Sequence, residues 1–77
     1  MARSRAKAFG DALRGLREER GLSQEAAALA CGLDRSYYGK VERADKVPTI
    51  TTLWRISDGL DTTPSELLSR AELLLRR

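Results

Sequence analysis

The sequence predicts an all-α domain built from five short helices. Apolar residues recur along the chain at spacings of three and four, which is the period of a helix with one buried side. A serine, aspartate or threonine stands immediately before four of the apolar segments, where a side-chain oxygen can cap a helix. No segment alternates apolar and polar residues long enough to predict a strand.

The first predicted helix covers residues 6–20. Its apolar residues recur every three or four positions and would form its buried side; they are Phe9, Ala12, Leu13 and Leu16. Gly21 ends this helix, because glycine readily adopts the left-handed conformation that closes many helices. Ahead of the first apolar position, residues 1–8 are predicted to form a basic leader that carries Arg3, Arg5 and Lys7.

Two more helices follow in close succession. Ser23 caps the second, which is predicted to run from Gln24 to residue 30 or 31. We expect Cys31 to be a small residue of the turn, buried or half-buried. Asp34 caps the third helix, which is predicted to run from Arg35 to about residue 43.

The link between these two helices is only three residues long. Gly32 permits a left-handed backbone in this link, and Leu33 can fill the angle between the helices. Residues 24–43 are therefore predicted to form a tight helix-turn-helix. One side of the second helix of the pair would stay exposed, with Arg35, Ser36, Gly39 and Lys40 on it and Tyr37 beside it. Such side chains suit contacts with base edges, and a merely solvated surface is the alternative.

The last two helices begin at threonine caps. Thr49 caps the fourth, whose apolar side would consist of Ile50, Leu53, Trp54, Ile56 and Leu60. The residues Ser57-Asp58-Gly59 weaken its end, so we expect the last turn to fray. The run Thr63-Pro64-Ser65-Glu66 combines a capping threonine, a proline at the first helical position and a glutamate three residues after the cap. It predicts a fifth helix from Pro64 nearly to the C-terminus.

Composition limits the chemistry available to the chain. Its 77 residues include no histidine and one cysteine, which excludes an internal disulfide, a zinc site of the Cys/His type and a histidine-based catalytic triad. The chain also has no glycine-rich phosphate loop and no evident pair of catalytic carboxylates. We therefore expect no enzyme activity, no metal and no cofactor.

The charge is moderately basic, with a formal net charge of +3. Residues 1–20 hold six basic and three acidic residues, whereas residues 47–77 hold four of each. This distribution is typical of a domain that binds a polyanion, although a charge of +3 is also common on surfaces that bind nothing. The apolar runs are too short to span a bilayer or to form a signal peptide, so we expect a cytoplasmic protein with no membrane partner.

Several motifs occur together in a fixed order. They are Gly21-Leu22-Ser23-Gln24-Glu25, then Ala30-Cys31-Gly32-Leu33-Asp34-Arg35-Ser36-Tyr37, then Val41-Glu42-Arg43 and Pro48-Thr49-Ile50. At these spacings they resemble the Cro and phage-repressor type of helix-turn-helix domain, over residues 9–68. The resemblance implies a five-helix, lambda-repressor-like fold that binds DNA. The segment Leu33-Asp34-Arg35-Ser36-Tyr37 and the short length further resemble controller proteins of restriction–modification systems, and prophage regulators are similar.

The resemblance implies a role for each candidate site residue. Four side chains would contact base edges in the major groove: Arg35, Ser36, Tyr37 and Lys40. Five residues would contact DNA phosphates: Ser23, Gln24, Arg43, Lys46 and Thr49. Gln24 would also brace the recognition helix. Arg17 and Glu42 stand where the family often places an ion pair between the first and third helices, and the basic leader could lie along a DNA groove.

Two residues of the recognition helix depart from the family pattern. Tyr38 stands where an aliphatic core residue is usual, so its hydroxyl needs a hydrogen-bond partner or water. Gly39 lies in the helix interior, at a cost of about 1 kcal/mol relative to alanine. One interpretation is that the missing side chain lets the backbone approach the bases more closely.

The fifth predicted helix is more apolar than one small core can cover. We therefore predict a two-fold symmetric homodimer, with an interface made by Trp54, Leu67, Leu68, Ala71, Leu74 and Leu75. Residues 69–77 would be the end of this dimerisation helix. The alternative is a helix that packs only on its own domain.

The resulting hypothesis is a dimeric transcriptional regulator that reads a palindromic operator in double-stranded DNA and needs no small-molecule ligand. Two recognition helices would enter successive major grooves about 34 Å apart. The alternative is an antitoxin-like module whose main partner is another protein. Because antitoxins of this fold also bind DNA, DNA binding alone does not separate the two hypotheses.

Overall fold

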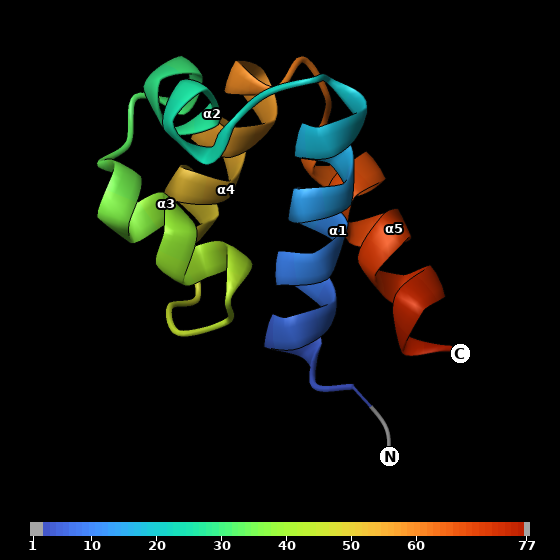
Figure 1. Ribbon diagram of the computed structural model, residues 1–77. Helices are drawn as coiled ribbons and strands as arrows, with labels where there is room; N and C mark the ends of the chain where they lie inside the picture. Colours follow the sequence, from blue (N-terminus) through green and yellow to red (C-terminus); the bar gives the residue numbers. More distant parts are fainter. Residues whose placement is uncertain (1–2, 77) are drawn as a thin grey trace.

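The computed structural model describes residues 3–76, which form five α-helices and no strand (Figure 1). In chain order the helices are α1 (Arg5–Glu19), α2 (Gln24–Cys31), α3 (Arg35–Glu42), α4 (Ile50–Gly59) and α5 (Pro64–Leu75). Helices α1 and α5 lie side by side, and α2, α3 and α4 are grouped on the other side of α1 (Figure 1). The predicted all-α fold class is confirmed, and each helix boundary stated above lies within about one residue of its predicted position.

Each helix begins at a side chain that accepts a hydrogen bond from the first turn. Four of these are the predicted caps Ser23, Asp34, Thr49 and Thr63. The fifth is Ser4, whose hydroxyl oxygen accepts from the Lys7 N–H at 3.0 Å. The prediction of a leader over residues 1–8 is therefore wrong for its second half, because the Ser4 cap starts α1 at Arg5 and the helix buries Ala8 in the core. Residues 1 and 2 lie outside the described residues.

Four helices end in the same way. The chain takes a left-handed conformation just after the last turn, and the following N–H groups bond back to carbonyls of the helix. The residues with this conformation are Gly21, Gly32, Ala44 and Asp61, with φ of 71°, 67°, 66° and 55°. After α3, the turn at Ala44 brings the N–H of Asp45 to the Lys40 carbonyl at 2.8 Å. Asp45 is thereby folded back toward the end of α3.

All five helices contribute to one apolar core. Its buried residues are Ala8, Phe9, Ala12, Leu13, Leu16, Ala27, Ala28, Cys31, Tyr38, Val41, Leu53, Ile56, Leu60, Leu67 and Ala71. Helix α5 is also fastened to α1 by a two-bond ion pair, in which Arg70 donates to Glu19 at 2.8 and 3.0 Å. Because α5 packs mainly on α1, the C-terminal helix is part of the domain rather than an extension from it.

The core includes the thiol of Cys31 and the phenol of Tyr38. The Cys31 thiol donates to the Ile56 carbonyl across 3.6 Å, and burial raises its pKa to about 11, so the thiol stays protonated and unreactive at neutral pH. The expectation of a small buried turn residue at Cys31 is confirmed. Burial likewise raises the pKa of Tyr38. Among residues 3–76, the buried Tyr38 hydroxyl has no hydrogen-bond partner.

A hydrogen-bonded ion network joins α1, α2 and α3. Arg17 donates from Nε to one Glu42 carboxylate oxygen at 2.6 Å and from Nη2 to the other at 3.0 Å. Gln24 donates from Nε2 to the same carboxylate at 3.0 Å, and Arg17 Nη1 donates to the Leu22 carbonyl at 2.9 Å. The Arg17–Glu42 pair implied by the resemblance is confirmed, and Gln24 braces α3 as expected.

The network determines the charge of Glu42, which is only 1% exposed. Burial raises the pKa of this carboxyl, but the hydrogen bonds from Arg17 and Gln24 outweigh burial and hold the pKa below its usual range. A carboxyl whose pKa falls on folding stabilises the fold above its unfolded pKa. That contribution is lost as the pH falls through the lower, folded pKa. The ion network is therefore fully formed at neutral pH.

Close packing holds the end of α4. A Cβ at Gly59 would lie 2.7 Å from the Ala30 carbonyl oxygen and 2.7 Å from the Cα of Cys31, so α4 approaches α2 at a distance that only glycine allows. Ser57 is buried and donates to the Leu53 carbonyl at 2.8 Å. The expectation that this turn frays is wrong, because contacts with α2 override weak helix propensity.

Two kinds of feature are missing from the part of the chain that the structure describes. None of its helices has the length and the apolar character that a bilayer crossing requires. No three Cys, Asp or Glu side chains come together there in a way that would hold a metal ion.

We predict that Gly59→Ala destabilises the fold, although alanine favours helix more than glycine does. The added Cβ would meet backbone atoms, so we expect the free energy of unfolding to fall by about 1–3 kcal/mol in chemical denaturation. Gly15→Ala is the matched control, because nothing lies within 4 Å of a Cβ at Gly15, and it should stabilise the fold by up to about 1 kcal/mol. Equal stability of the two variants would contradict the packing argument.

We also predict that Arg17→Ala lowers the free energy of unfolding by about 3–5 kcal/mol, because it leaves the buried Glu42 carboxylate without its cation. Arg14→Ala is the control. It removes an ion pair with Asp11 at 2.9 Å whose arginine side chain is 45% exposed, and should cost less than about 1 kcal/mol. The free energy of unfolding is measured by chemical denaturation at neutral pH. A similar decrease in both variants would show that the burial of Glu42 does not increase the contribution of its ion pair to stability.

Candidate nucleic-acid interface

Helices α2 and α3 form the predicted helix-turn-helix. Gly32 takes its left-handed conformation in the link, and the Leu33 N–H donates to the Ala28 carbonyl at 2.9 Å. The Leu33 side chain is partly buried against the core, where it fills the angle between the helices. Asp34 then accepts from the Tyr37 N–H at 3.2 Å and starts α3. Helix α3 is thereby fixed at one angle to α2.

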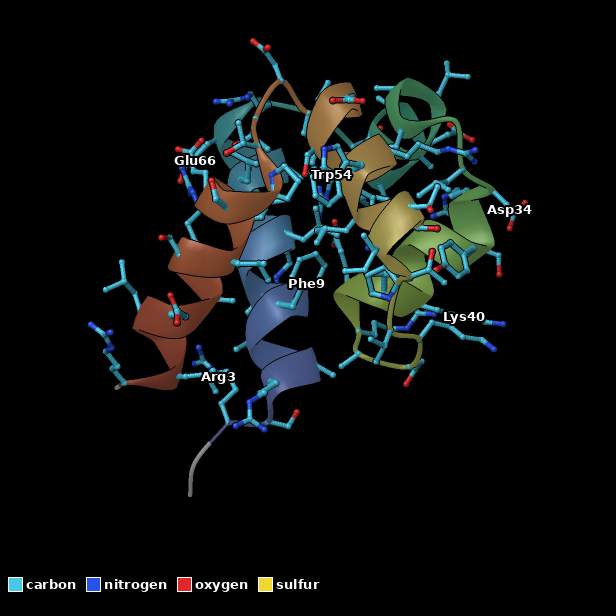
Figure 2. The ribbon with its side chains drawn as sticks, turned by 180° about the vertical axis from the view of Figure 1, so that it is seen from behind. Arg3, Phe9, Asp34, Lys40, Trp54 and Glu66 are labelled. Carbon is cyan, nitrogen blue, oxygen red and sulfur yellow. The ribbon has the colours of Figure 1, made fainter. Side chains whose placement is uncertain are left out.

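Helix α3 buries one side and exposes the other. The buried side contains Tyr38, Val41 and Glu42. The exposed side contains Arg35, Ser36 and Lys40. Figure 2 shows Lys40 extending outward from α3, with Asp34 at the start of the same helix. Tyr37 is partly buried and packs against the core at the border between the two sides. The structure therefore brings all four predicted base-contacting side chains to α3, three of them exposed.

The predicted phosphate-contacting residues lie at helix ends and in the segment after α3. Arg43 and Lys46 are exposed. The hydroxyl oxygens of Ser23 and Thr49 accept backbone N–H groups of their own helices at 3.0 and 3.2 Å, so both residues act as caps. Gln24 is partly buried and donates to Glu42, as described above.

Gly39 does not lie open on the exposed side of α3. It is buried, and the side chains of Arg43 and Gln24 lie over it. The interpretation that the missing side chain leaves the α3 backbone open to the bases is therefore wrong, because these two neighbours occupy that space.

Basic residues near the start of α1 gather around one carboxylate. The Asp11 side chain is only 13% exposed, and Arg3, Lys7 and Arg14 lie 3.4, 3.0 and 2.9 Å from its oxygens. Arg3 and Lys7 are therefore attached to α1 instead of forming a free arm. Sequence reasoning missed this cluster, although the spacing of Lys7, Asp11 and Arg14 is typical of ion pairs on one helix face.

The apolar residues of the predicted dimer interface fall into two groups. Leu67 and Ala71 are buried in the chain's own core against α1, so their assignment to an interface between protomers is wrong. Trp54 and Leu68 are exposed, with Trp54 on α4 visible in Figure 2. Leu74 and Leu75 are half-buried. Leu73 is not among the predicted interface residues, and it is 58% exposed near the end of α5.

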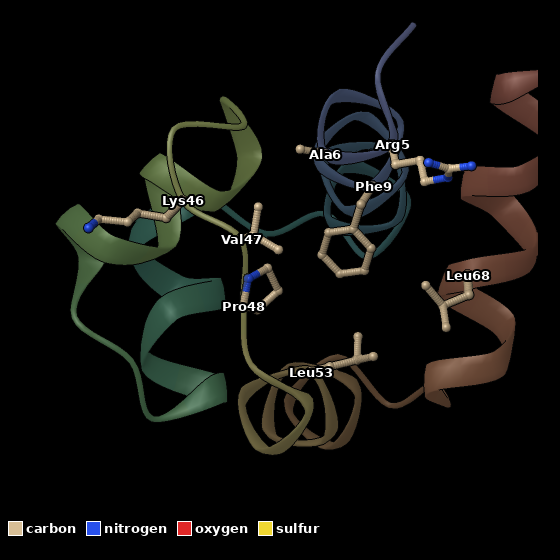
Figure 3. Close-up of a pocket in the computed structure, with 8 residues that line it drawn as sticks. All are labelled: Arg5, Ala6, Phe9, Lys46, Val47, Pro48, Leu53 and Leu68. Atoms are coloured by element: carbon tan, nitrogen blue, oxygen red, sulfur yellow. The ribbon is translucent and has the colours of Figure 1, made fainter.

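An apolar groove of about 280 Å³ opens beside Leu68 (Figure 3). It lies between α1, the segment before α4, α4 itself and α5. Its lining residues are Arg5, Ala6, Phe9, Lys46, Val47, Pro48, Leu53 and Leu68. Figure 3 shows Phe9, Pro48, Leu53 and Leu68 around the same space. Leu68 in this groove and Trp54 on α4 are large exposed apolar side chains, of a kind that α3 lacks.

Comparison with known proteins agrees with this geometry. The profile of the helix-turn-helix family matches residues 13–67. Control protein C.MunI of a Mycoplasma species is 43% identical over 65 residues, which cover 83% of this chain and 88% of that protein. The transcriptional regulator SutR of Escherichia coli K12 is 36% identical over 64 residues, and the match spans 83% of this chain but only 36% of SutR.

Among solved structures, the restriction-modification controller protein C.AhdI from Aeromonas hydrophila has a similar fold. It is 44% identical to this chain and superposes with a TM-score of 0.78, over 80% of this chain and 94% of C.AhdI. Residues 13–67, which the family profile matches, contain both helices of the motif and the turn between them. This chain belongs to the helix-turn-helix family.

Proposed function

We propose that this protein is a transcriptional regulator that binds operator DNA sequence-specifically as a homodimer. The observation that carries the proposal is the exposed side of α3, from which Arg35, Ser36 and Lys40 project while the other side is locked into the core. Arginine and lysine pair well with guanine edges in the major groove, and serine can donate to or accept from any base. Membership of the helix-turn-helix family supports this role.

The role of each side chain follows from its place around α3. Arg35, Ser36 and Lys40, with Tyr37 at the border, would read base edges. Ser23, Gln24, Arg43, Lys46 and Thr49 would contact phosphates and fix the orientation of α3 in the groove. The function is binding and involves no catalytic step, and its place of action is the cytoplasm, where the DNA is.

The proposal of a homodimer rests on the apolar surface around Trp54 and Leu68. Both side chains are about half exposed, and the groove beside Leu68 offers an apolar surface that a second copy can cover. A two-fold dimer through α4 and α5 would present two α3 helices to successive major grooves, about 34 Å apart. Dimeric binding then requires a palindromic operator.

Within this family we infer the class of restriction–modification controllers. Identities of 43% to C.MunI and 44% to C.AhdI, over most of the length of each, support this choice. Selection of bound sites from random duplex DNA at near-physiological salt tests the function. A palindrome with half-sites about one helical turn apart is the expected result. A folded, dimeric protein that enriches no sequence would instead favour the antitoxin-like alternative, with a protein as main partner.

We predict that Arg35→Ala and Arg43→Ala weaken DNA binding in different ways. Arg35→Ala should cost about 1–3 kcal/mol on the selected operator and relax specificity at one base pair. Arg43→Ala should weaken binding to all sequences alike and flatten the salt dependence. Binding measured on operator and random duplexes at several salt concentrations separates the two. Identical behaviour of both variants would overturn this division of roles.

We further predict that Leu68→Glu yields a folded monomer. Leu68 is 46% exposed, so the substitution spares the core, while a buried carboxylate in the dimer interface is strongly unfavourable. Sedimentation equilibrium should show the change, and affinity for the palindrome should fall far more than affinity for a half-site. Leu29→Glu is the matched control, since Leu29 is 83% exposed on α2 and outside the proposed interface. A dimer that persists in Leu68→Glu would exclude this interface.

A further inference from the structure

Gly39 occupies an unusual place in α3. Positions 35, 39 and 43 are four residues apart and therefore form one row along the helix surface. Arg35 and Arg43 at the ends of this row are exposed, but Gly39 between them is buried. Since glycine has no side chain, side chains of its neighbours help to bury it.

The neighbours are the guanidinium of Arg43 and the amide of Gln24. A Cβ built on Gly39 would lie 3.1 Å from Arg43 Nη1 and 3.9 Å from Arg43 Cζ. It would lie 3.4 Å from Gln24 Oε1. The Arg43 side chain therefore runs back along α3 from the end of the helix, and its guanidinium lies over Gly39, as does the side-chain amide of Gln24 at the start of α2.

Each of these neighbours has a partner in the structure. Arg43 Nε lies 3.4 Å from the Asp45 carboxylate, and the left-handed turn at Ala44 is what folds Asp45 back to this position. Gln24 is held by its bond to Glu42. The Arg43 side chain nevertheless remains 57% exposed, so the outer N–H groups of its guanidinium face water.

We propose that Gly39 is a positioning residue for DNA binding. Its missing side chain leaves room for the Arg43 guanidinium near the Gln24 amide oxygen, so that the guanidinium presents its outer N–H groups to one phosphate of the DNA backbone. A guanidinium that already lies in place loses less conformational freedom on contact with a phosphate. This inference rests on the proposed function and accounts for a glycine at a helix position where it weakens the helix.

The test compares Gly39→Ala with the wild-type protein and with Gly15→Ala. In Gly39→Ala the closest neighbour of the new Cβ is the flexible end of Arg43, so the fold is kept and the melting temperature should rise by about 4–8 °C. Affinity for a random-sequence duplex should nevertheless fall about tenfold, the effect of one weakened contact to a charged phosphate. Gly15→Ala should give a similar thermal gain with unchanged DNA binding, since a Cβ there touches nothing.

The salt dependence identifies the contact that is lost. The slope of log K against log salt should decrease by about 0.9 for each bound protomer in Gly39→Ala, as it does in Arg43→Ala. The double variant Gly39→Ala/Arg43→Ala should bind no more weakly than Arg43→Ala alone. A Gly39→Ala protein that binds like wild type, or a double variant with additive losses, would overturn the inference.

The same measurements keep this inference separate from the proposed function. Random duplexes report phosphate contacts, whereas operator selection reports base reading. If Arg43→Ala binds random DNA like wild type, the inference fails while an enriched palindrome still supports the regulator. A wild-type protein that binds neither random nor selected DNA would overturn both.

Discussion

Three helices meet around the carboxylate of Glu42, a charged group with almost no exposure to water. Without partners this charge would be very costly to bury, so Arg17 from α1 and Gln24 from α2 must both reach it. Because Glu42 is the last residue of α3, the carboxylate fixes the orientation of that helix relative to the other two. The exposed side of α3 is therefore directed outward by an interaction on its buried side.

Glycine has three different physical roles in this small fold. At Gly32 it takes a left-handed conformation in the turn between α2 and α3, and at Gly59 it allows α4 to approach the α2 backbone. At Gly39 it leaves space for the charged end of another side chain. Helix propensity disfavours glycine at the last two positions, so contacts elsewhere in the fold and at its surface must explain them.

The helices could be predicted from the sequence because their signals are local. Capping side chains at Ser23, Asp34, Thr49 and Thr63 and the glycines that end α1 and α2 act within one helical turn. Ser4 was missed because a short basic segment hid its capping role, and the predicted leader was too long as a result. The exposed side of α3 was predicted for the same local reason, since helical period alone separates its two sides.

Relations between helices could not be predicted in the same way. Periodicity shows that α5 is apolar, but it does not show that α1 already covers Leu67 and Ala71. Nor does it show that α2 holds the end of α4 through contact at Gly59. The burial of Gly39 depends on where two long side chains from neighbouring segments come to rest, and no spacing rule contains that information.

Trp54 is the single tryptophan of the chain, and it lies on α4 with 53% of its surface exposed. The protein therefore carries one indole fluorophore, placed outside the helix that would enter DNA. Indole emission responds to the polarity of its surroundings, so a partner that covers α4 shifts the spectrum while a ligand on α3 leaves it in water. Indole emission can thus report self-association in an unlabelled sample, without a direct contribution from DNA bound at α3.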